Sequence, residues 1–326
     1  MAGNGRLGAR HRRPDATALT IYLPIAELPV AIFAIFAMGL AVGFISGMFG
    51  VGGGFLMTPL LIFTGVPAAV AVASVSAHMA ASSFSGALSY LRKGLIDLPL
   101  SGVLLSGGLV GTGAGVATFT LLRAYGQVDL VIGLSYMTLL GSVGALMLVE
   151  SVRAILRSRR GQGVSIRRPG THGWLLRLPL KMRFRRSRIY VSAIPVVVIG
   201  FGIGFLGALL GVGGGFLLVP ALIYLLRVPT QTAVGTSLVL TLVTMTAATI
   251  LQAVANGTVD AVLALILMVG GTMGAQFGAR AGQSLKAEHL RLLLGLLVLA
   301  VGLRMGVDLA RPPEDPFAVT AKGRGN

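Results

Sequence analysis

Apolar residues gather in long runs along this chain, and short polar or glycine- and proline-containing segments separate the runs. A run of roughly 20 apolar residues matches the hydrocarbon thickness of a bilayer and predicts a membrane-spanning helix. Two shorter stretches, 54–64 and 216–226, follow the first and fifth runs and are too short to cross alone. The predicted spans lie near 28–49, 67–91, 98–122, 128–149, 190–210, 229–255, 259–279 and 288–307.

The composition of the chain agrees with this pattern. The 326 residues are 55% hydrophobic and 11% charged, with a mean hydropathy of +0.87, whereas a soluble domain carries about 25% charged residues. An ordinary cytosolic enzyme is therefore excluded, and we expect an all-α polytopic protein of the plasma or inner membrane. The chain has no cysteine, which excludes disulfides, thiolate metal sites and cysteine nucleophiles.

An internal repeat is the strongest signal in the sequence. The segment GFISGMFGVGGGFLMTP at 43–59 recurs as GFLGALLGVGGGFLLVP at 204–220, and AVAS at 71–74 matches AVGT at 233–236. The order of these blocks predicts two repeats of four transmembrane helices, each with a glycine-broken first helix that continues as a half-helix. The expected parts are a basic N-terminal segment at 1–27, a first transmembrane repeat at 28–150, a basic loop at 151–188, a second repeat at 189–308 and a C-terminal tail at 309–326.

Each repeat also carries a ladder of glycines in a later span. The matching positions are Gly107, Gly108, Gly111 and Gly115 in the first repeat and Gly270, Gly271, Gly274 and Gly278 in the second. A four-residue spacing places such glycines on one face of a helix, where they let another helix approach closely. We therefore expect these ladders to serve packing rather than binding.

The net charge of +17 is concentrated outside the apolar runs. Twelve Lys and Arg residues and no acid lie in 151–188, and a second basic cluster extends from Arg6 to Arg13. The positive-inside rule places both clusters in the cytoplasm, which requires four crossings per half, parallel halves and cytoplasmic termini. Anionic lipids are the expected partners of the loop. Nucleic acid is not an expected partner, since the stretch contains no recognisable binding module.

A second arrangement of the halves stays open. If 54–64 and 216–226 fold back as re-entrant hairpins, the two halves become inverted and the N-terminus moves to the outside. The N-terminal arginines argue against this arrangement. The parallel arrangement has its own weakness, because it leaves Arg280, Lys286 and Arg291 outside.

The two GVGGG segments, at 50–54 and 211–215, are the candidate binding elements. Because Gly costs about 1 kcal/mol relative to Ala in a helix, we expect each cluster to break its helix. A broken backbone in a membrane must be buried in protein or line a wet cavity. The helix that begins after the break presents free N–H groups and the positive end of its dipole, which suit an oxyanion. The other interpretation is that these glycines only permit close packing.

The duplicated motif GxxGxxxGVGGGFxxxP, with AVGTS at 233–237 and GxxxGAxxGAR at 270–280, resembles the sulfite exporter TauE/SafE family over most of 30–310. The resemblance implies a membrane permease for small sulfur-containing anions such as sulfite or sulfonates. The first repeat departs from the pattern around Ser74, so we expect the two half-sites to differ. The substrate contacts that the resemblance implies are Gly52, Gly53, Gly54, Gly213, Gly214 and Gly215, with Ser74, Thr236 and Ser237 nearby.

His78 is the one ionisable residue deep in a predicted span. Intramembrane ionisable groups are functional by default hypothesis, here as a proton carrier or as an added cation for the anion. The alternative is a neutral hydrogen-bond donor between helices. The acidic residues near the spans all flank them, which leaves the path free of negative charge and suits an anion.

These features favour a secondary transporter for a small oxyanion. The alternatives are an anion channel and a membrane assembly or docking protein that uses the basic loop. We do not expect an enzyme, because the sequence lacks a Ser/His/Asp set at plausible depth, an HExxH motif, a Walker A motif and paired central carboxylates. We predict no cofactor and no metal. The sequence leaves open the direction of transport and whether the protein is a monomer or a homodimer.

Overall fold

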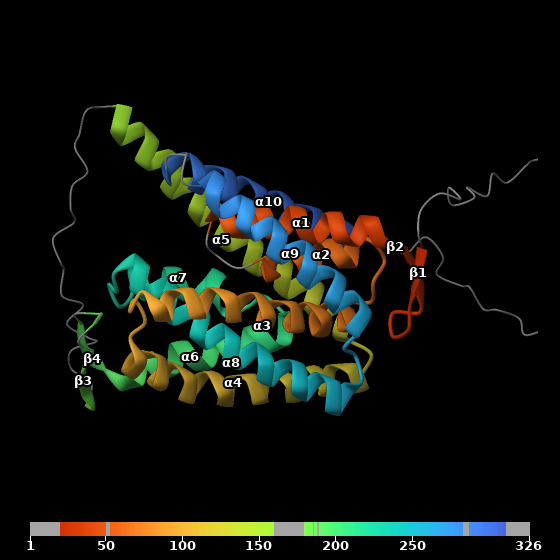
Figure 1. Ribbon diagram of the computed structural model, residues 1–326, viewed down its shortest axis with the longest axis horizontal. Coiled ribbons are helices and arrows are strands. Elements are labelled where there is room, and N and C mark those ends of the chain that lie inside the picture. Colours follow the sequence, from red (N-terminus) through yellow and green to blue (C-terminus); the bar gives the residue numbers. More distant parts are fainter. Residues whose placement is uncertain are drawn as a thin grey trace, which may run out of the picture.

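The computed structural model describes residues 20–49, 53–159, 179–184, 186–187, 189–282 and 287–310. Within these residues the chain forms ten helices and four short strands (Figure 1). Seven of the helices in the described part of the chain are long and apolar enough to cross a membrane. The prediction of an all-α polytopic membrane protein is therefore confirmed, with the strands confined to two small hairpins.

The same order of elements occurs in both halves of the chain: a strand hairpin, a helix, a short helix and three long helices. The first half contains β1 (Thr20–Leu23), β2 (Leu28–Ala31), α1 (Ile32–Phe49), α2 (Gly54–Phe63), α3 (Ala68–Arg92), α4 (Leu98–Ala124) and α5 (Val128–Arg159). The second half contains β3 (Lys181–Phe184), β4 (Ile189–Ser192), α6 (Ala193–Leu210), α7 (Gly214–Tyr224), α8 (Thr230–Asn256), α9 (Ala261–Gly282) and α10 (Ala287–Ala310).

Helices of the two halves pack against each other in pairs: α1 with α9, α4 with α6, α5 with α10 and α3 with α8. The glycine ladders form the closest of these contacts. A Cβ added at Gly107 or Gly111 of α4 would overlap the carbonyl oxygens of Val197 and Phe201 on α6. The ladder of α9 meets the backbone of α1 in the same way, at Phe36, Leu40 and Phe44. The prediction that the ladders serve packing is confirmed.

A buried carboxylate holds each strand hairpin to the helix bundle. Asp97 caps α4 and accepts the N–H and hydroxyl of Ser187, in the β3–β4 turn, at 2.8 and 2.7 Å. Asp260 precedes α9 and accepts the N–H of Ile25, in the β1–β2 turn, at 3.1 Å. Both aspartates are 1% exposed. The α3–α4 and α8–α9 turns lie at opposite ends of the bundle, so the two hairpins do as well (Figure 1).

The chain reverses its direction inside the molecule between α6 and the short helix α7. Residues 209–214, which connect α6 to α7, are buried. Gly211 and Gly213 have φ values of +69° and +71°, a left-handed region in which glycine is unstrained. α6 therefore runs inward from the β3–β4 end, and α7 returns toward that end, where α8 begins next to the α3–α4 turn (Figure 1).

α2 likewise leads back to the β1–β2 end. α3 starts there, since the hydroxyl of Ser74 accepts the N–H of Asp260 at 3.0 Å. The structure differs here from the sequence-based prediction, in which 54–64 and 216–226 continue the preceding spans. For 216–226 the physical reason is the backbone conformation of Gly211 and Gly213, which reverses the direction of the chain instead of interrupting a straight helix. Residues 50–52, which precede α2, lie outside the described residues.

Gly111 and Gly113 provide a matched test of the helix packing, because both lie in α4. We expect Gly111→Ala to destabilise the protein by about 1–3 kcal/mol, since the added Cβ overlaps the backbone of Phe201. Gly113 has nothing within 4 Å of an added Cβ, so Gly113→Ala should leave stability unchanged or raise it by up to about 1 kcal/mol. Thermal unfolding of the purified variants in detergent measures both, and equal stability of the two variants would refute the assignment.

Candidate functional site

The glycine breaks of the two halves meet in the interior. α2 begins at Gly54 and α7 at Gly214. In their first turns the rings of Phe55 and Phe216 stack, with centroids 4.2 Å apart and both side chains 1% exposed. A Cβ added at Gly54 would lie 2.7 Å from the carbonyl oxygen of Gly211, so only glycine lets the two breaks touch.

The helix starts present backbone donors to this meeting point. Helix geometry leaves the first N–H groups of a helix without an acceptor in that helix. Among the described residues, no acceptor bonds to the N–H groups of Gly214 and Gly215. In α2, by contrast, the N–H groups of Leu56 and Met57 are engaged, because both bond to the carbonyl oxygen of Gly53, at 3.2 and 3.1 Å. The helix dipoles add positive potential at both starts, which suits an anion.

The glycines predicted from the sequence therefore occupy one place in the fold. Gly53 and Gly213 are the N-caps of α2 and α7, and Gly54, Gly214 and Gly215 form their first turns. Gly52, which was predicted with them, lies outside the described residues. The predicted helix break is observed after α6, where α7 starts anew behind three non-helical residues.

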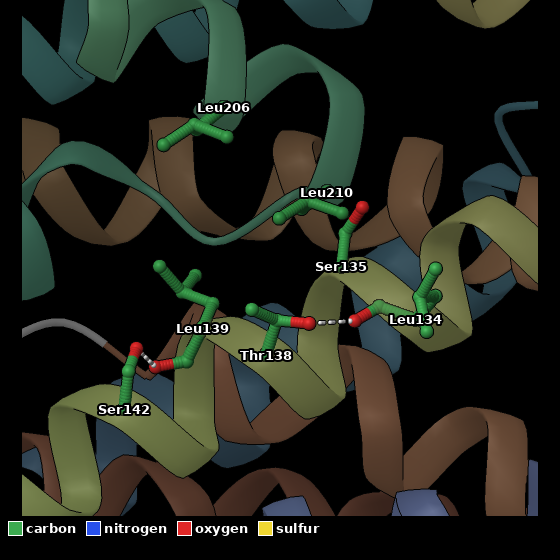
Figure 2. Close-up of a pocket in the computed structure, with 7 residues that line it drawn as sticks. All are labelled: Leu134, Ser135, Thr138, Leu139, Ser142, Leu206 and Leu210. Atoms are coloured by element: carbon green, nitrogen blue, oxygen red, sulfur yellow. Dashed lines mark hydrogen bonds between the residues drawn. The ribbon is translucent and has the colours of Figure 1, made fainter.

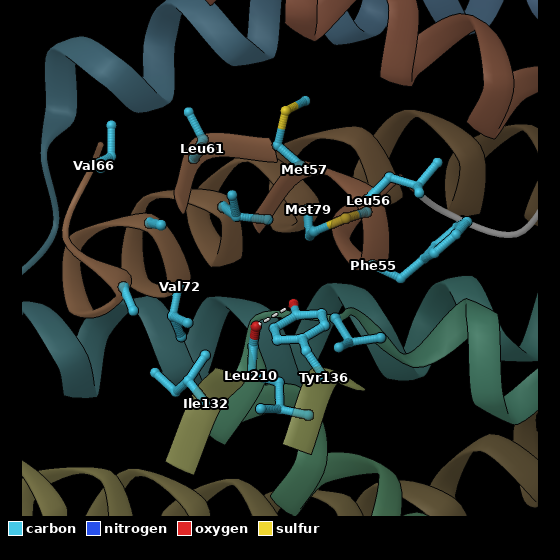
Figure 3. Packing of buried hydrophobic residues seen from close by; sticks show 14 of the residues in the cluster. Phe55, Leu56, Met57, Leu61, Val66, Val72, Met79, Ile132, Tyr136 and Leu210 are labelled. Atoms are coloured by element: carbon cyan, nitrogen blue, oxygen red, sulfur yellow. Dashed lines mark hydrogen bonds between the residues drawn. The ribbon is translucent and has the colours of Figure 1, made fainter. Parts of the chain in front are cut away.

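Apolar side chains and one tyrosine of the first half cover the meeting point (Figure 3). The Sδ of Met79, on α3, would lie 2.6 Å from a Cβ at Gly54 and 3.4 Å from one at Gly213. Tyr136, on α5, is fully buried, and its hydroxyl donates to the carbonyl oxygen of Leu210 at 2.6 Å. This hydrogen bond fixes the end of α6 and with it the start of the reversal.

Two threonine hydroxyls lie beside the second glycine segment, and sequence reasoning did not assign them to the site. Thr58 of α2 is fully buried, and its Oγ1 would lie 3.2 Å from a Cβ at Gly211. Thr241 of α8 is 3% exposed, and its Oγ1 would lie 2.7 Å from a Cβ at Gly214. The hydroxyl of Thr58 is hydrogen-bonded to that of Tyr136, whereas the Oγ1 of Thr241 has no hydrogen-bond partner in the structure. The only sequence signal was the high hydroxyl content of the helix that carries Thr241.

The hydroxyls that the sequence did single out lie elsewhere or are engaged. Ser74 accepts the N–H of Asp260, at the α8–α9 turn. Ser237 donates to the carbonyl oxygen of Val234 at 2.8 Å. Thr236 is buried without a partner, and its neighbour Gly235 packs against the α3–α4 turn. Ser74 and Ser237 thus use their hydroxyls away from the second glycine segment, although Val72, two residues before Ser74, contacts Gly211.

His78 lies on another face of α3, against Gly271 of α9, where an added Cβ would overlap its ring. The imidazole is 3% exposed, and its Nδ1 has no hydrogen-bond partner in the structure. The buried acids Asp97 and Asp260 both stand at helix starts near the two ends. Among the described residues, no three His, Asp or Glu side chains gather as a metal site would require.

Among the described residues, two cavities lie between the helices, and no predicted site residue lines either of them. One, of about 360 Å³, lies between α5 and α6 and reaches Leu210, next to the α6–α7 reversal (Figure 2). Its other lining residues are Leu134, Ser135, Thr138, Leu139, Ser142 and Leu206. A second cavity, of about 370 Å³, lies between α3, α8 and α9. In the first cavity, the hydroxyls of Thr138 and Ser142 bond to carbonyls of their own helix, so that cavity offers few free donors.

Long apolar helices around two interior half-helices define a multi-pass membrane protein with the architecture of a transporter. The sulfite exporter TauE/SafE family matches residues 35–305. The chain therefore belongs to this family, and it is a membrane transporter.

Curated relatives agree with this assignment. The chain is 28% identical over 272 residues to the probable membrane transporter protein YjnA of Bacillus subtilis, covering 83% of this chain and 98% of the relative. It is 30% identical over 266 residues to a probable membrane transporter protein of Xylella fastidiosa, covering 80% and 90%. No solved structure matches the chain.

Proposed function

We propose that the protein is a permease that carries a small sulfur-containing oxyanion, such as sulfite or an organosulfonate. The observation that carries the proposal is the meeting of two helix starts, at Gly54 and Gly214, inside the molecule. The name of the family supplies the class of substrate. The names of the relatives say only that they are probable membrane transporters.

The physical chemistry of this place favours an oxyanion over a cation. Helix starts offer N–H donors and positive potential, and glycine lets an oxygen atom reach the backbone. The donors are neutral, so binding does not depend on a fixed charge that would oppose release. The stacked rings of Phe55 and Phe216 fill the space between the helix starts. We therefore propose that the anion enters only when these rings move apart.

We further propose that the two halves are inverted relative to each other in the membrane. Each half then contributes three full crossings and one re-entrant hairpin, α1–α2 or α6–α7. An odd number of crossings separates the two strand hairpins, in keeping with their positions at opposite ends of the bundle. This revises the sequence-based expectation of four crossings per half with both basic clusters on one side.

The charges of the described residues support this arrangement and favour one orientation. At the β3–β4 end the described charges are mainly basic, with the buried Asp97 beside Arg92, Lys93, Arg153, Arg183, Arg186, Arg227 and Arg280. The opposite end combines acids with few bases: Glu27, Arg123, Asp129, Asp260, Arg304 and Asp308. The positive-inside rule then places the β3–β4 end in the cytoplasm and the end of α10 outside. Arg280, which the parallel arrangement left outside, joins the basic side, where anionic lipids are the proposed partners of the 151–188 loop.

Reporter fusions test the orientation. A topology reporter inserted within 161–170 should read cytoplasmic, and one fused after Asn326 should read outside, because an odd number of crossings lies between them. Alkaline phosphatase and a cytoplasm-active fluorescent protein at both positions give complementary signals. The same reading at both positions would restore an even number of crossings and overturn the inverted arrangement.

Transport by the purified protein tests the substrate and the site together. Proteoliposomes with the wild-type protein should exchange labelled sulfite in counterflow with saturation. Gly54→Val should reduce the flux per folded molecule at least tenfold, because a branched side chain there meets Met79 and the carbonyls of Gly211 and Val212. Loss of two or three charge-assisted hydrogen bonds of roughly 1.5–3 kcal/mol each accounts for such an effect.

Gly113→Val is the matched control, because an added Cβ at that position meets open space. Flux is normalised to monodisperse protein for every variant. Near-normal flux in Gly54→Val would refute the site at the helix starts. A wild-type flux that does not saturate would indicate an anion channel. No flux of any sulfur oxyanion would indicate a membrane assembly or docking protein instead of a transporter.

A further inference from the structure

We infer that Thr241 is a substrate-binding residue, whose hydroxyl donates a hydrogen bond to the oxyanion held at the start of α7. This inference rests on the proposed function and adds a side-chain ligand to its backbone site. Helix starts alone do not identify a ligand. The additional observation is that the hydroxyl of Thr241 is more than nine-tenths buried, has no partner and lies against the first residue of α7.

Thr241 differs from its neighbours on α8 in what its hydroxyl does. Thr and Ser in a helix normally bond to a backbone carbonyl three or four residues earlier. Thr244, Thr246 and Thr249 do so, at 2.7, 2.7 and 2.8 Å. Thr241 makes no such bond, and its Oγ1 would lie 2.7 Å from a Cβ at Gly214. Its hydroxyl is therefore directed to the start of α7 instead of to its own helix.

Thr58 approaches the same segment from the other half. It lies in the second turn of α2, is fully buried and makes no bond to its own helix. Its Oγ1 lies next to Gly211, at the beginning of the reversal. The neighbouring hydroxyl of Tyr136 donates to the carbonyl oxygen of Leu210 and is hydrogen-bonded to Thr58. Thr58 therefore helps to hold the end of α6, and Thr241 is the residue that directs an unpaired hydroxyl to the start of α7.

An unpaired buried hydroxyl is unfavourable, and native proteins carry few of them. One beside a helix start calls for an acceptor that is present only part of the time, which a transported anion is. The N–H groups of Gly214 and Gly215 and the hydroxyl of Thr241 also make three donors, which match an anion with three oxygens on one centre better than a carboxylate with two. The ligand class that this arrangement favours is therefore a sulfite or a sulfonate.

The experiment compares Thr241→Val with Thr244→Val, two isosteric changes one turn apart on α8. Both threonines are buried, but only Thr244 uses its hydroxyl within its own helix. In sulfite counterflow, Thr241→Val should raise KM about 10- to 100-fold, and Thr241→Ser should restore it. Thr244→Val should keep KM within about twofold of wild type.

Thermal unfolding without substrate provides a second readout. Removing an unpaired hydroxyl should leave the melting temperature of Thr241→Val unchanged or higher, whereas a structural role would lower it. Equal KM values in Thr241→Val and Thr244→Val would overturn the inference. If Thr241→Val does not fold, Thr241→Ala decides in the same assay. Wild-type protein without saturable sulfite flux would instead refute the proposed function itself.

Discussion

A chain that reverses inside a membrane must shield the reversal with protein, because lipid offers no partner to unpaired N–H and C=O groups. The connection between α6 and α7 is shielded by α2, α3 and α5 of the other half. α9 follows α1 through contacts such as Gly271 with Gly43, and α4 follows α6 through Gly111 with Phe201. Such contacts require small residues, since close packing takes the place of the hydrophobic effect between helices in lipid. The high glycine content of the chain is a condition for burying its two breaks.

Each end of the bundle is also held together by hydrogen bonds between the two halves. Asp97 of the first half accepts hydrogen bonds from Ser187 of the second half, and Asp260 of the second half accepts one from Ile25 of the first half. Each carboxylate caps a helix and fixes the turn of a strand hairpin at the same time. Because neither end is built by one half alone, the halves cannot act as independent domains. We infer that motion in this fold is a sliding or tilting of paired helices rather than a hinge between two bodies.

Hydrophobic patterning was sufficient to locate the long helices, because the bilayer sets the length of an apolar run. It could not give the direction of 54–64 and 216–226, since a straight continuation and a reversal bury the same apolar residues. For 216–226 the difference lies in the backbone of Gly211 and Gly213, which residue type permits but does not dictate. Charge counting then favoured parallel halves because the cluster from Arg6 to Arg13 carried as much weight as the central loop.

The repeat located the glycines of the site, but it was a poor guide to the hydroxyls around them. It singled out Ser74 and Thr236 as an equivalent pair, yet Ser74 accepts the N–H of Asp260. In the alignment of the halves, Met79 is the counterpart of Thr241, so one helix start is covered by a thioether and the other by a hydroxyl. The two starts are therefore not interchangeable. If the anion binds as proposed, it is held mainly at α7, and the step that releases it has to change the contact between α7 and α8.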